Sequence, residues 1–281
     1  MTRPPRFLLA LDMDGTLLRD DKTIGDEDRA AIRDAAADGI AVTLATGRLS
    51  SGSLPTAREL GLSTPLVCAD GGLLVDPTTG AALERRAIAT EHAAVALEAL
   101  TAHGLVPYVF LEDSIHCGEA GVQHRAIVEV WSRDLVVHPS LAEASAWRRP
   151  DTVALTVGIG ARSAVERASQ VLREQHAEAL DTVHFGMNGL TLWAVRSLPH
   201  GCDKGDMLVR LAARLGVPMA RVAAVGDWFN DLGMFKLAGR SFAMAQAPDI
   251  VKQAATDVLR SSSATGGGIA EAIAALRATL A

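Results

Sequence analysis

Short apolar runs, each followed by a polar loop, recur along the first part of the chain. They lie at Phe7–Leu11, Ile40–Leu44 and Pro65–Cys68. A continuous apolar run bounded by turn residues is typical of a strand that is buried on both faces of a parallel sheet. The pattern therefore predicts three buried strands, each with polar residues where the strand ends.

Helical patterns separate these runs. The segment Asp26–Asp38 has acidic residues in its first turn and is followed by Gly39, and the segment from about Ser50 to Leu60 stops at Gly61. Acids at the start of a helix and glycine just after its end match the helix dipole and the usual C-terminal cap. The alternation of strand and helix predicts a parallel sheet with helical crossovers.

The same alternation returns in the last third of the chain. Asp203 is a predicted N-cap for a helix over Lys204–Leu215, and Val222–Val225 is a predicted fourth buried strand. Further helical patterns cover Leu232–Ala238, Asp249–Ala255 and Ile269–Leu280.

The middle of the chain follows a different pattern. Helical patterns at Thr90–His103 and Ser163–Ala179 alternate irregularly with strand-like pieces at Leu105–Leu111, Leu135–His138 and Val153–Ile159. This arrangement is typical of an α+β module. We therefore expect an α/β core formed by residues 1–82 and 188–281, with an α+β domain inserted at 83–187.

Composition excludes several classes of protein. A chain of 281 residues suits one large or two modest domains, and its net charge of −6 argues against a nucleic-acid or anionic-membrane partner. The three cysteines are few and widely separated, which favours a reducing compartment over a disulfide framework. No signal-peptide pattern and no apolar stretch near the roughly 20 residues of a membrane helix is present, so we expect a cytoplasmic protein.

The polar residues that follow the predicted strands carry the candidate chemistry. Carboxyl ends of parallel strands meet at one edge of a sheet, where ligands bind. Several carboxylates crowded at this edge repel one another, and a bound cation relieves that repulsion. Oxygen ligands at this density suit Mg²⁺. No His or Cys has the spacing of a zinc site. The groups are Asp12, Asp14 and Thr16; Thr46 and Arg48; Asp70; and Asp227, Asn230 and Asp231.

The spacing of two aspartates and the position of one lysine also indicate a binding site at this edge of the sheet. Asp12 and Asp14 are two residues apart on an extended segment, so both side chains can face one substrate. Lys204 falls in the first turn of a predicted helix, where the helix dipole disfavours a cation. We therefore expect Lys204 to have an anionic partner, either a bound phosphate or the aspartate cluster.

At this point the motifs resemble those of a known family. Asp-x-Asp-Gly-Thr at 12–16, Thr-Gly-Arg at 46–48, Lys-Gly at 204–205 and Gly-Asp-x-x-Asn-Asp at 226–231 occur in order, each at a predicted strand end or helix start. Together they resemble the haloacid dehalogenase superfamily of phosphohydrolases. Thr-Gly-Arg, the loop Cys68–Gly72 and the long insertion look most like its Cof-type branch, which implies a Rossmann-like three-layer α/β core with a parallel sheet and an inserted C2-type α+β cap.

The resemblance implies a role for each motif residue. Asp12 would be the nucleophile that forms an aspartyl-phosphate, and Asp14 would be the general acid and base. Thr46 and Lys204 would bind the phosphoryl oxygens with support from Thr16. The remaining substrate-binding positions implied by the motifs are Gly47, Arg48 and Asn230.

The implied cofactor is Mg²⁺. Asp12, Asp227 and the backbone carbonyl of Asp14 would hold it, and Asp231 would assist either directly or through Lys204. The metal and Lys204 would offset negative charge on the phosphoryl oxygens.

Some positions depart from the pattern of the branch. Asp70 stands where the branch often has Asn, and Gln246 stands where it often has Asn after the Ala-Met segment. Trp228 and Phe229 are bulkier than the residues common in that loop. These departures bear on the substrate more than on the reaction.

We therefore expect a Mg²⁺-dependent phosphatase acting on a small phosphorylated metabolite, either a sugar phosphate or a nucleotide- or cofactor-related phosphomonoester. The expected partner is that metabolite, with no nucleic acid and no membrane. A phosphomutase on the same scaffold and a non-catalytic phosphometabolite-binding module are the alternatives. The inserted cap would select the substrate, and the sequence carries no signal for an oligomeric state.

Overall fold

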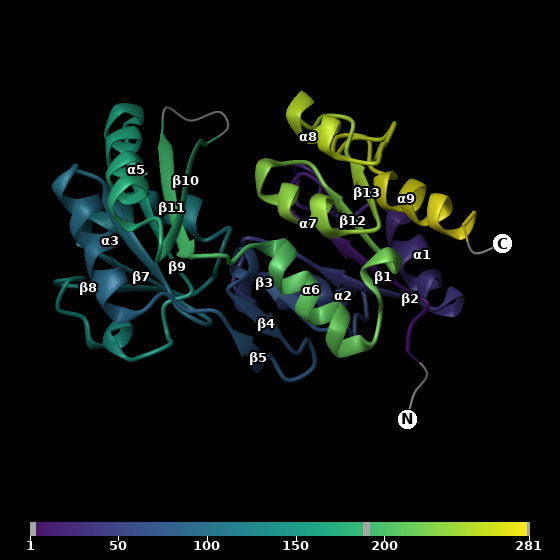
Figure 1. The fold of residues 1–281 in the computed structure, drawn as a ribbon, viewed down its shortest axis with the longest axis horizontal. Coiled ribbons are helices and arrows are strands. Elements are labelled where there is room, and N and C mark those ends of the chain that lie inside the picture. Colours follow the sequence, from purple (N-terminus) through teal and green to yellow (C-terminus); the bar gives the residue numbers. More distant parts are fainter. Residues whose placement is uncertain (1–3, 188–191, 280–281) are drawn as a thin grey trace. The chain divides into compact units, whose positions relative to one another are not determined.

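The chain folds into two compact units. The computed structural model describes residues 4–187 and 192–279 (Figure 1). The first unit comprises Met1–Gly47, Ser53–Leu83 and Asp203–Ala281, and the second comprises Arg48–Gly52 and Glu84–Cys202. Both ends of the chain thus belong to the first unit, and the second unit is an insertion between them.

The first unit is built on a parallel sheet. The strand order is β14-β13-β12-β1-β2, and every pairing described within it is parallel. This confirms the predicted parallel sheet in the α/β core. The strands are β1 (Phe7–Leu11), β2 (Ile40–Leu44), β12 (Val222–Gly226), β13 (Arg240–Ala243) and β14 (Asp257–Val258).

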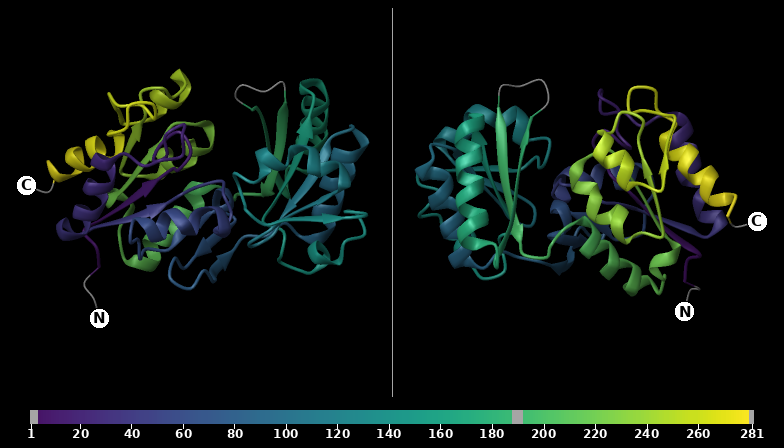
Figure 2. Two further views of the ribbon diagram at one scale, coloured as in Figure 1. Left: turned by 180° about the vertical axis from the view of Figure 1, so that it is seen from behind. Right: turned by 45° about the horizontal axis from the view of Figure 1, so that its top comes forward.

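Helices cover the two faces of this sheet (Figure 2). Side chains of α6 (Lys204–Leu215) and α7 (Leu232–Leu237) form one apolar core with alternate residues of β1 and β12. On the other face, α1 (Asp26–Ala35) packs against α9 (Gly268–Arg277). The remaining helices of this unit are α2 (Ser50–Glu59), whose first residues group with the second unit, and α8 (Asp249–Ala254).

The third predicted strand pairs differently from the first two. Strand β3 (Leu66–Cys68) touches the main sheet through a single parallel bridge between Ala45 and Val67. It then pairs antiparallel with β4 (Leu73–Val75), which is followed in the same small sheet by β5 (Ala82–Arg85). The sequence pattern predicted β3 but not its antiparallel partner, because Leu73–Val75 directly follows the Asp70–Gly72 turn and has no separate turn signal of its own.

The second unit contains a mixed sheet, as expected for an inserted α+β module. Its strand order is β10-β11-β9-β6-β7-β8, and all described pairings are antiparallel except the one between β7 and β8. The strands are β6 (Val106–Phe110), β7 (Ile115–Gly118), β8 (Leu135–His138), β9 (Leu155–Gly160), β10 (Leu180–Gly186) and β11 (Trp193–Pro199).

Two long helices cover one face of this sheet. Helix α3 (Thr90–Ala102) and helix α5 (Arg162–His176) form apolar cores with residues of β6 and β11. The short α4 (Arg125–Val128) completes the unit. The unit extends to Cys202, whereas the sequence pattern placed the boundary at 187, because β11 pairs with both β10 and β9.

No helix among the described residues is both long enough and apolar enough to cross a membrane.

A buried carboxylate on α1 binds backbone groups at the start of α9. Asp28 on α1 is 2% exposed, and its side chain accepts hydrogen bonds from the backbone N–H groups of Gly267 and Ala270, each at 2.9 Å. These N–H groups lie at the start of α9, where helix N–H groups have no partner within the helix. Asp28 therefore caps α9 from another helix.

Replacing Asp28 by Ala should lower the free energy of unfolding by about 2 kcal/mol, because two buried N–H groups lose a charged acceptor. Urea unfolding followed by circular dichroism measures this change. The control is Asp34→Ala, an exposed position on the same helix, which we expect to change stability by less than about 0.5 kcal/mol. Equal effects of the two substitutions would contradict the capping role.

Candidate active site

The loop after β1 is shaped by close contact with the loop after β12. The backbone N–H of Asp12 donates to the carbonyl of Val225 at 3.0 Å, which continues the strand pairing into the loop. Gly15 has a φ of +86°, and a Cβ atom there would lie 2.4 Å from Oδ2 of Asp227. Only glycine fits this turn, so the Asp-x-Asp-Gly spacing brings the two loops together.

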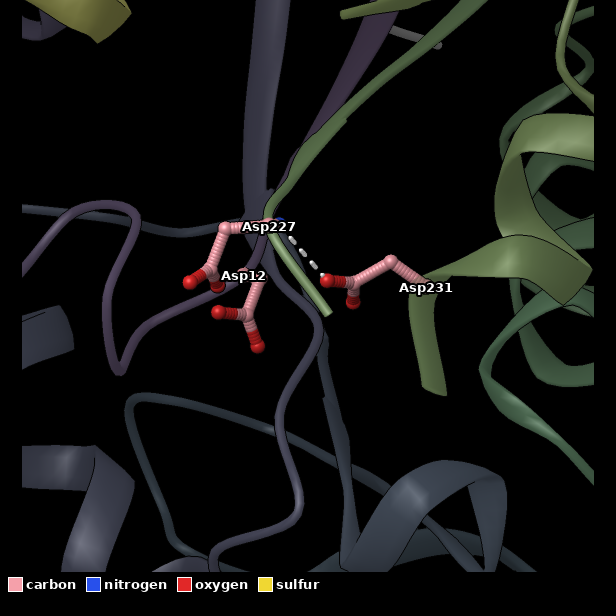
Figure 3. Close-up of side chains that lie close together, drawn as sticks. All are labelled: Asp12, Asp227 and Asp231. Carbon is pink, nitrogen blue, oxygen red and sulfur yellow. Dashed lines mark hydrogen bonds between the residues drawn. The ribbon is translucent and has the colours of Figure 1, made fainter. Parts of the chain in front are cut away.

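Three aspartates converge where these strands end (Figure 3). Asp12, Asp227 and Asp231 each offer a carboxylate oxygen, and these oxygens all lie within 4.8 Å of one another. Asp12 is 6% exposed, Asp227 is 9% exposed and Asp231 is fully buried. The structure thus brings together three of the four residues predicted as metal ligands.

Lys204 lies within this cluster. Its ammonium group donates to Oδ1 of Asp12 at 2.6 Å and to Oδ1 of Asp231 at 2.8 Å, and its side chain is fully buried. Burial acts to lower the pKa of Lys204, but the charges of Asp12, Asp231 and Asp70 outweigh it and raise the pKa above its usual value. Lys204 is therefore a charged ammonium at neutral pH, and its expected anionic partner is the aspartate cluster.

Asp231 is held in place by several donors. Its Oδ2 accepts the backbone N–H groups of Asp227 and Trp228 at 2.9 and 3.0 Å, while Oδ1 accepts from Lys204. Both oxygens are thus engaged by protein donors. Of the two roles left open by the sequence, this arrangement favours the one in which Asp231 acts through Lys204.

Asp227 receives donors on both of its carboxylate oxygens. The hydroxyl of Thr16 donates to Oδ1 at 3.1 Å, and the side-chain amide of Gln246 donates to Oδ2 at 3.3 Å. Burial, followed by the charge of Asp231, raises the pKa of Asp227 to about 6. Burial likewise raises the pKa of Asp12 well above its usual value, against the opposing effect of Lys204.

Asp14 is more exposed than the three clustered aspartates. Its side chain is 34% exposed and accepts a hydrogen bond from Lys22 at 3.0 Å. Lys22 is itself 54% exposed and has a φ of +65°. No motif points to this ion pair, because Lys22 lies in a polar turn without a distinctive pattern.

The other predicted substrate-binding residues are distributed between the two units. Thr46 is buried two residues after the end of β2, next to Gly47, and Asn230 donates its side-chain amide to Asp70 at 2.9 Å. Arg48 groups with the second unit, where its guanidinium donates to the carbonyl of Gly52 at 3.3 Å. Thr46, Gly47 and Asn230 all belong to the unit that carries the aspartate cluster.

The sequence did not predict the hydrogen bonds that Gln246 makes in the site. In addition to Asp227, its amide nitrogen donates to the carbonyl of Gly15, and its Oε1 accepts the backbone N–H of Ser263 at 3.2 Å. Gln246 thus connects three loops. The available signal was its place two residues after the Ala243-Met244 segment.

The donor set fits a hard divalent cation. The ligand atoms are carboxylate oxygens, which Mg²⁺ and similar ions prefer. Three carboxylates face one ammonium group, and this excess negative charge contributes to the raised pKa values of Asp12 and Asp227. A bound cation would relieve the repulsion. Asp12 and Asp227 are the residues of this group best placed to hold it, since both are slightly exposed whereas Asp231 is fully buried.

Comparisons with known proteins agree with this site. A family model described as haloacid dehalogenase-like hydrolase matches residues 9–273. The chain is 29% identical over 249 residues to the Bacillus subtilis 5-amino-6-(5-phospho-D-ribitylamino)uracil phosphatase YcsE. That alignment covers 88% of this chain and 87% of the phosphatase. It is 28% identical over 267 residues to the Escherichia coli pyridoxal phosphate phosphatase YbhA, in an alignment that covers 90% of this chain and 92% of that protein.

The fold also matches solved structures. A haloacid dehalogenase-like hydrolase from B. subtilis superposes with a TM-score of 0.81 at 25% sequence identity. The match covers 96% of this chain and 99% of that one. The parallel core sheet with a separate inserted mixed sheet is therefore the architecture of these hydrolases.

The raised pKa values predict that metal binding depends on pH. Protons compete with the cation for Asp12 and Asp227, so affinity should rise as the pH rises through about 6, where Asp227 loses its proton. Thermal unfolding with and without Mg²⁺ measures this effect. We expect a larger Mg²⁺-induced increase in melting temperature at pH about 7.5 than at pH about 5. The same increase at both pH values, or its persistence in Asp227→Asn, would contradict the assignment.

Proposed function

We propose a substrate class and a mechanism on the premise that this chain belongs to the haloacid dehalogenase-like hydrolase family, in its Cof-type branch, and is a phosphoric monoester hydrolase. The proposed reaction is the Mg²⁺-dependent hydrolysis of a small phosphorylated metabolite. It proceeds through an aspartyl-phosphate on Asp12.

One observation carries this proposal. A fully buried Lys204 joins Asp12 to Asp231, and carboxylate oxygens of Asp12, Asp227 and Asp231 lie within 4.8 Å of one another. Phosphoryl transfer requires positioned groups and stabilised charge more than it requires covalent chemistry. The buried ammonium and the carboxylate group supply fixed positive charge and a place for a cation beside the same nucleophile.

In the first step, a carboxylate oxygen of Asp12 attacks phosphorus. A bond forms between this oxygen and phosphorus while the ester P–O bond breaks, and Asp14 gives its proton to the leaving alkoxide. Lys204 holds Oδ1 of Asp12, which leaves Oδ2 as the oxygen not bonded to that ammonium group.

In the second step, Asp14 takes a proton from a water molecule as that water attacks phosphorus. The bond between phosphorus and Asp12 breaks, inorganic phosphate is released and Asp12 returns to a carboxylate. Asp14 is suited to contact both the alcohol and the water, because its side chain is partly exposed rather than enclosed in the cluster.

The remaining residues bind the phosphoryl group. Lys204 and the Thr46–Gly47 turn contribute positive charge and hydrogen-bond donors, and Thr16 orients Asp227. Asp12, Asp227 and the backbone carbonyl of Asp14 would hold Mg²⁺, which would offset negative charge on the phosphoryl oxygens.

The proposed substrate is a sugar phosphate or a nucleotide- or cofactor-related phosphomonoester. The names of two similar proteins support this class, because one acts on a phosphorylated ribitylaminouracil and the other on pyridoxal phosphate. We assign the choice among such substrates to the second unit, which corresponds to the C2-type cap of the branch.

The test is the release of inorganic phosphate from a panel of phosphorylated metabolites in the presence of Mg²⁺. Asp12→Asn should lower the rate about a thousandfold or more, because an amide oxygen is a poor nucleophile. The exposed variant Asp34→Asn should keep the wild-type rate. Equal rates for wild type and Asp12→Asn would overturn the nucleophile assignment, and isomerised substrate without free phosphate would identify a phosphomutase.

A further inference from the structure

The turn after β3 holds a buried carboxylate that the proposed mechanism does not use. Asp70 is 4% exposed, and its backbone has a φ of +51° and a ψ of +32°. Its neighbours Ala69 and Gly71 also have positive φ values, of +51° and +103°. A left-handed conformation costs a residue other than glycine about 1 kcal/mol or more, so the surrounding structure must hold this turn in place.

Two segments of the candidate site enclose the turn. A Cβ atom on Gly71 would lie 2.1 Å from the carbonyl oxygen of Asp203, which precedes Lys204. A Cβ atom on Gly47 would lie 2.9 Å from Oδ2 of Asp70, and the backbone N–H of Asp70 donates to the carbonyl of Thr46 at 2.9 Å. The carboxylate of Asp70 therefore lies against the segments proposed to bind the phosphoryl group.

Asp70 also contacts the loop after β12. Its Oδ1 accepts a hydrogen bond from the side-chain nitrogen of Asn230 at 2.9 Å. An ionised carboxylate only accepts hydrogen bonds, whereas an amide can turn either its NH₂ group or its oxygen toward a partner. Asp70 thus fixes the orientation of Asn230, with NH₂ toward the carboxylate and Oδ1 turned away from it. The Asn that the branch often carries at this position would leave the orientation open.

The charge of Asp70 acts on the same site. It is one of three carboxylates that oppose the effect of burial and raise the pKa of Lys204. A negative charge next to the Thr46–Gly47 turn also repels a phosphate bound there, since like charges interact strongly in a partly desolvated site. A neutral amide of the same shape would lack this repulsion.

From these contacts we propose that Asp70 is a positioning residue that locks the amide of Asn230 in one orientation and keeps the affinity of the site for inorganic phosphate low. The second part rests on the proposed function, because it takes the Thr46–Gly47 turn and Lys204 as the phosphoryl-binding groups. In this arrangement Asp70 favours departure of the phosphate product.

The charge effect is tested with Asp70→Asn, which keeps the shape of the side chain and removes its charge. Calorimetric titration of the Mg²⁺-loaded protein with inorganic phosphate should give a dissociation constant about fivefold lower than that of wild type. Asp28→Asn is the matched control, since it also neutralises a buried carboxylate in the first unit. We expect it to lower stability and to leave phosphate binding unchanged.

The orientation effect is tested by exchanging the two residues. Asn230→Asp alone places two carboxylates against each other and should lower the melting temperature by several degrees. The double variant Asp70→Asn/Asn230→Asp restores one donor and one acceptor with opposite polarity, so it should recover most of that loss. Additive losses in the double variant would show that the hydrogen bond does not set the orientation.

These measurements separate the inference from the proposed function. An unchanged phosphate dissociation constant in a folded Asp70→Asn variant would overturn the charge effect, even if the wild type hydrolyses phosphate esters. Failure of the wild type to hydrolyse any compound in the panel would overturn the proposed function. The melting temperatures of the exchanged pair would still report on Asn230 in that case.

Discussion

The candidate site depends on one buried interaction, in which the ammonium group of Lys204 binds Asp12 and Asp231. Removing three charged groups from water is costly, and only close mutual contacts offset that cost. The contacts are short, at 2.6 and 2.8 Å, and Asp231 receives two further backbone donors on its other oxygen. This network holds Asp12, the proposed nucleophile, in place and links the N-terminal strand β1 to segments more than 190 residues away.

The fold makes this interaction possible because it brings distant strand ends together. Strands β1 and β12 are neighbours in a parallel sheet, so their following loops leave the sheet at the same edge. Lys204 adds a third segment, since Asp203 caps α6 by accepting the backbone N–H of Asp206 at 2.8 Å. The helix therefore begins at a defined residue, and its first side chain reaches the carboxylates despite the unfavourable helix dipole.

The sequence predicted the parts of the molecule that follow from local pattern. Apolar runs such as Ile40–Leu44 became buried parallel strands, and the motif residues Asp12, Asp227, Asp231 and Lys204 met as expected. The pairing of β11 with β9 and the contact of Gln246 with Asp227 did not follow from the pattern, because each depends on a partner from another segment of the chain. The ion pair of Lys22 with Asp14 did not follow from it either, because Lys22 lies in a turn without a distinctive sequence. Long-range pairing and side-chain hydrogen bonds are properties of the folded chain.

The balance of charge in the first unit links metal and phosphate binding. Asp12, Asp227, Asp231 and Asp70 all lie close to a single buried ammonium group, so the site alone has an excess of negative charge. An incoming phosphate adds to this excess, and a bound cation reduces it. Binding of the two must therefore be mutually favourable, since each changes the electrostatic free energy of the other by the same amount. In the proposed reaction, the metal-loaded protein therefore binds substrate more tightly than the metal-free protein does, and Asp70 weakens the binding of the phosphate product.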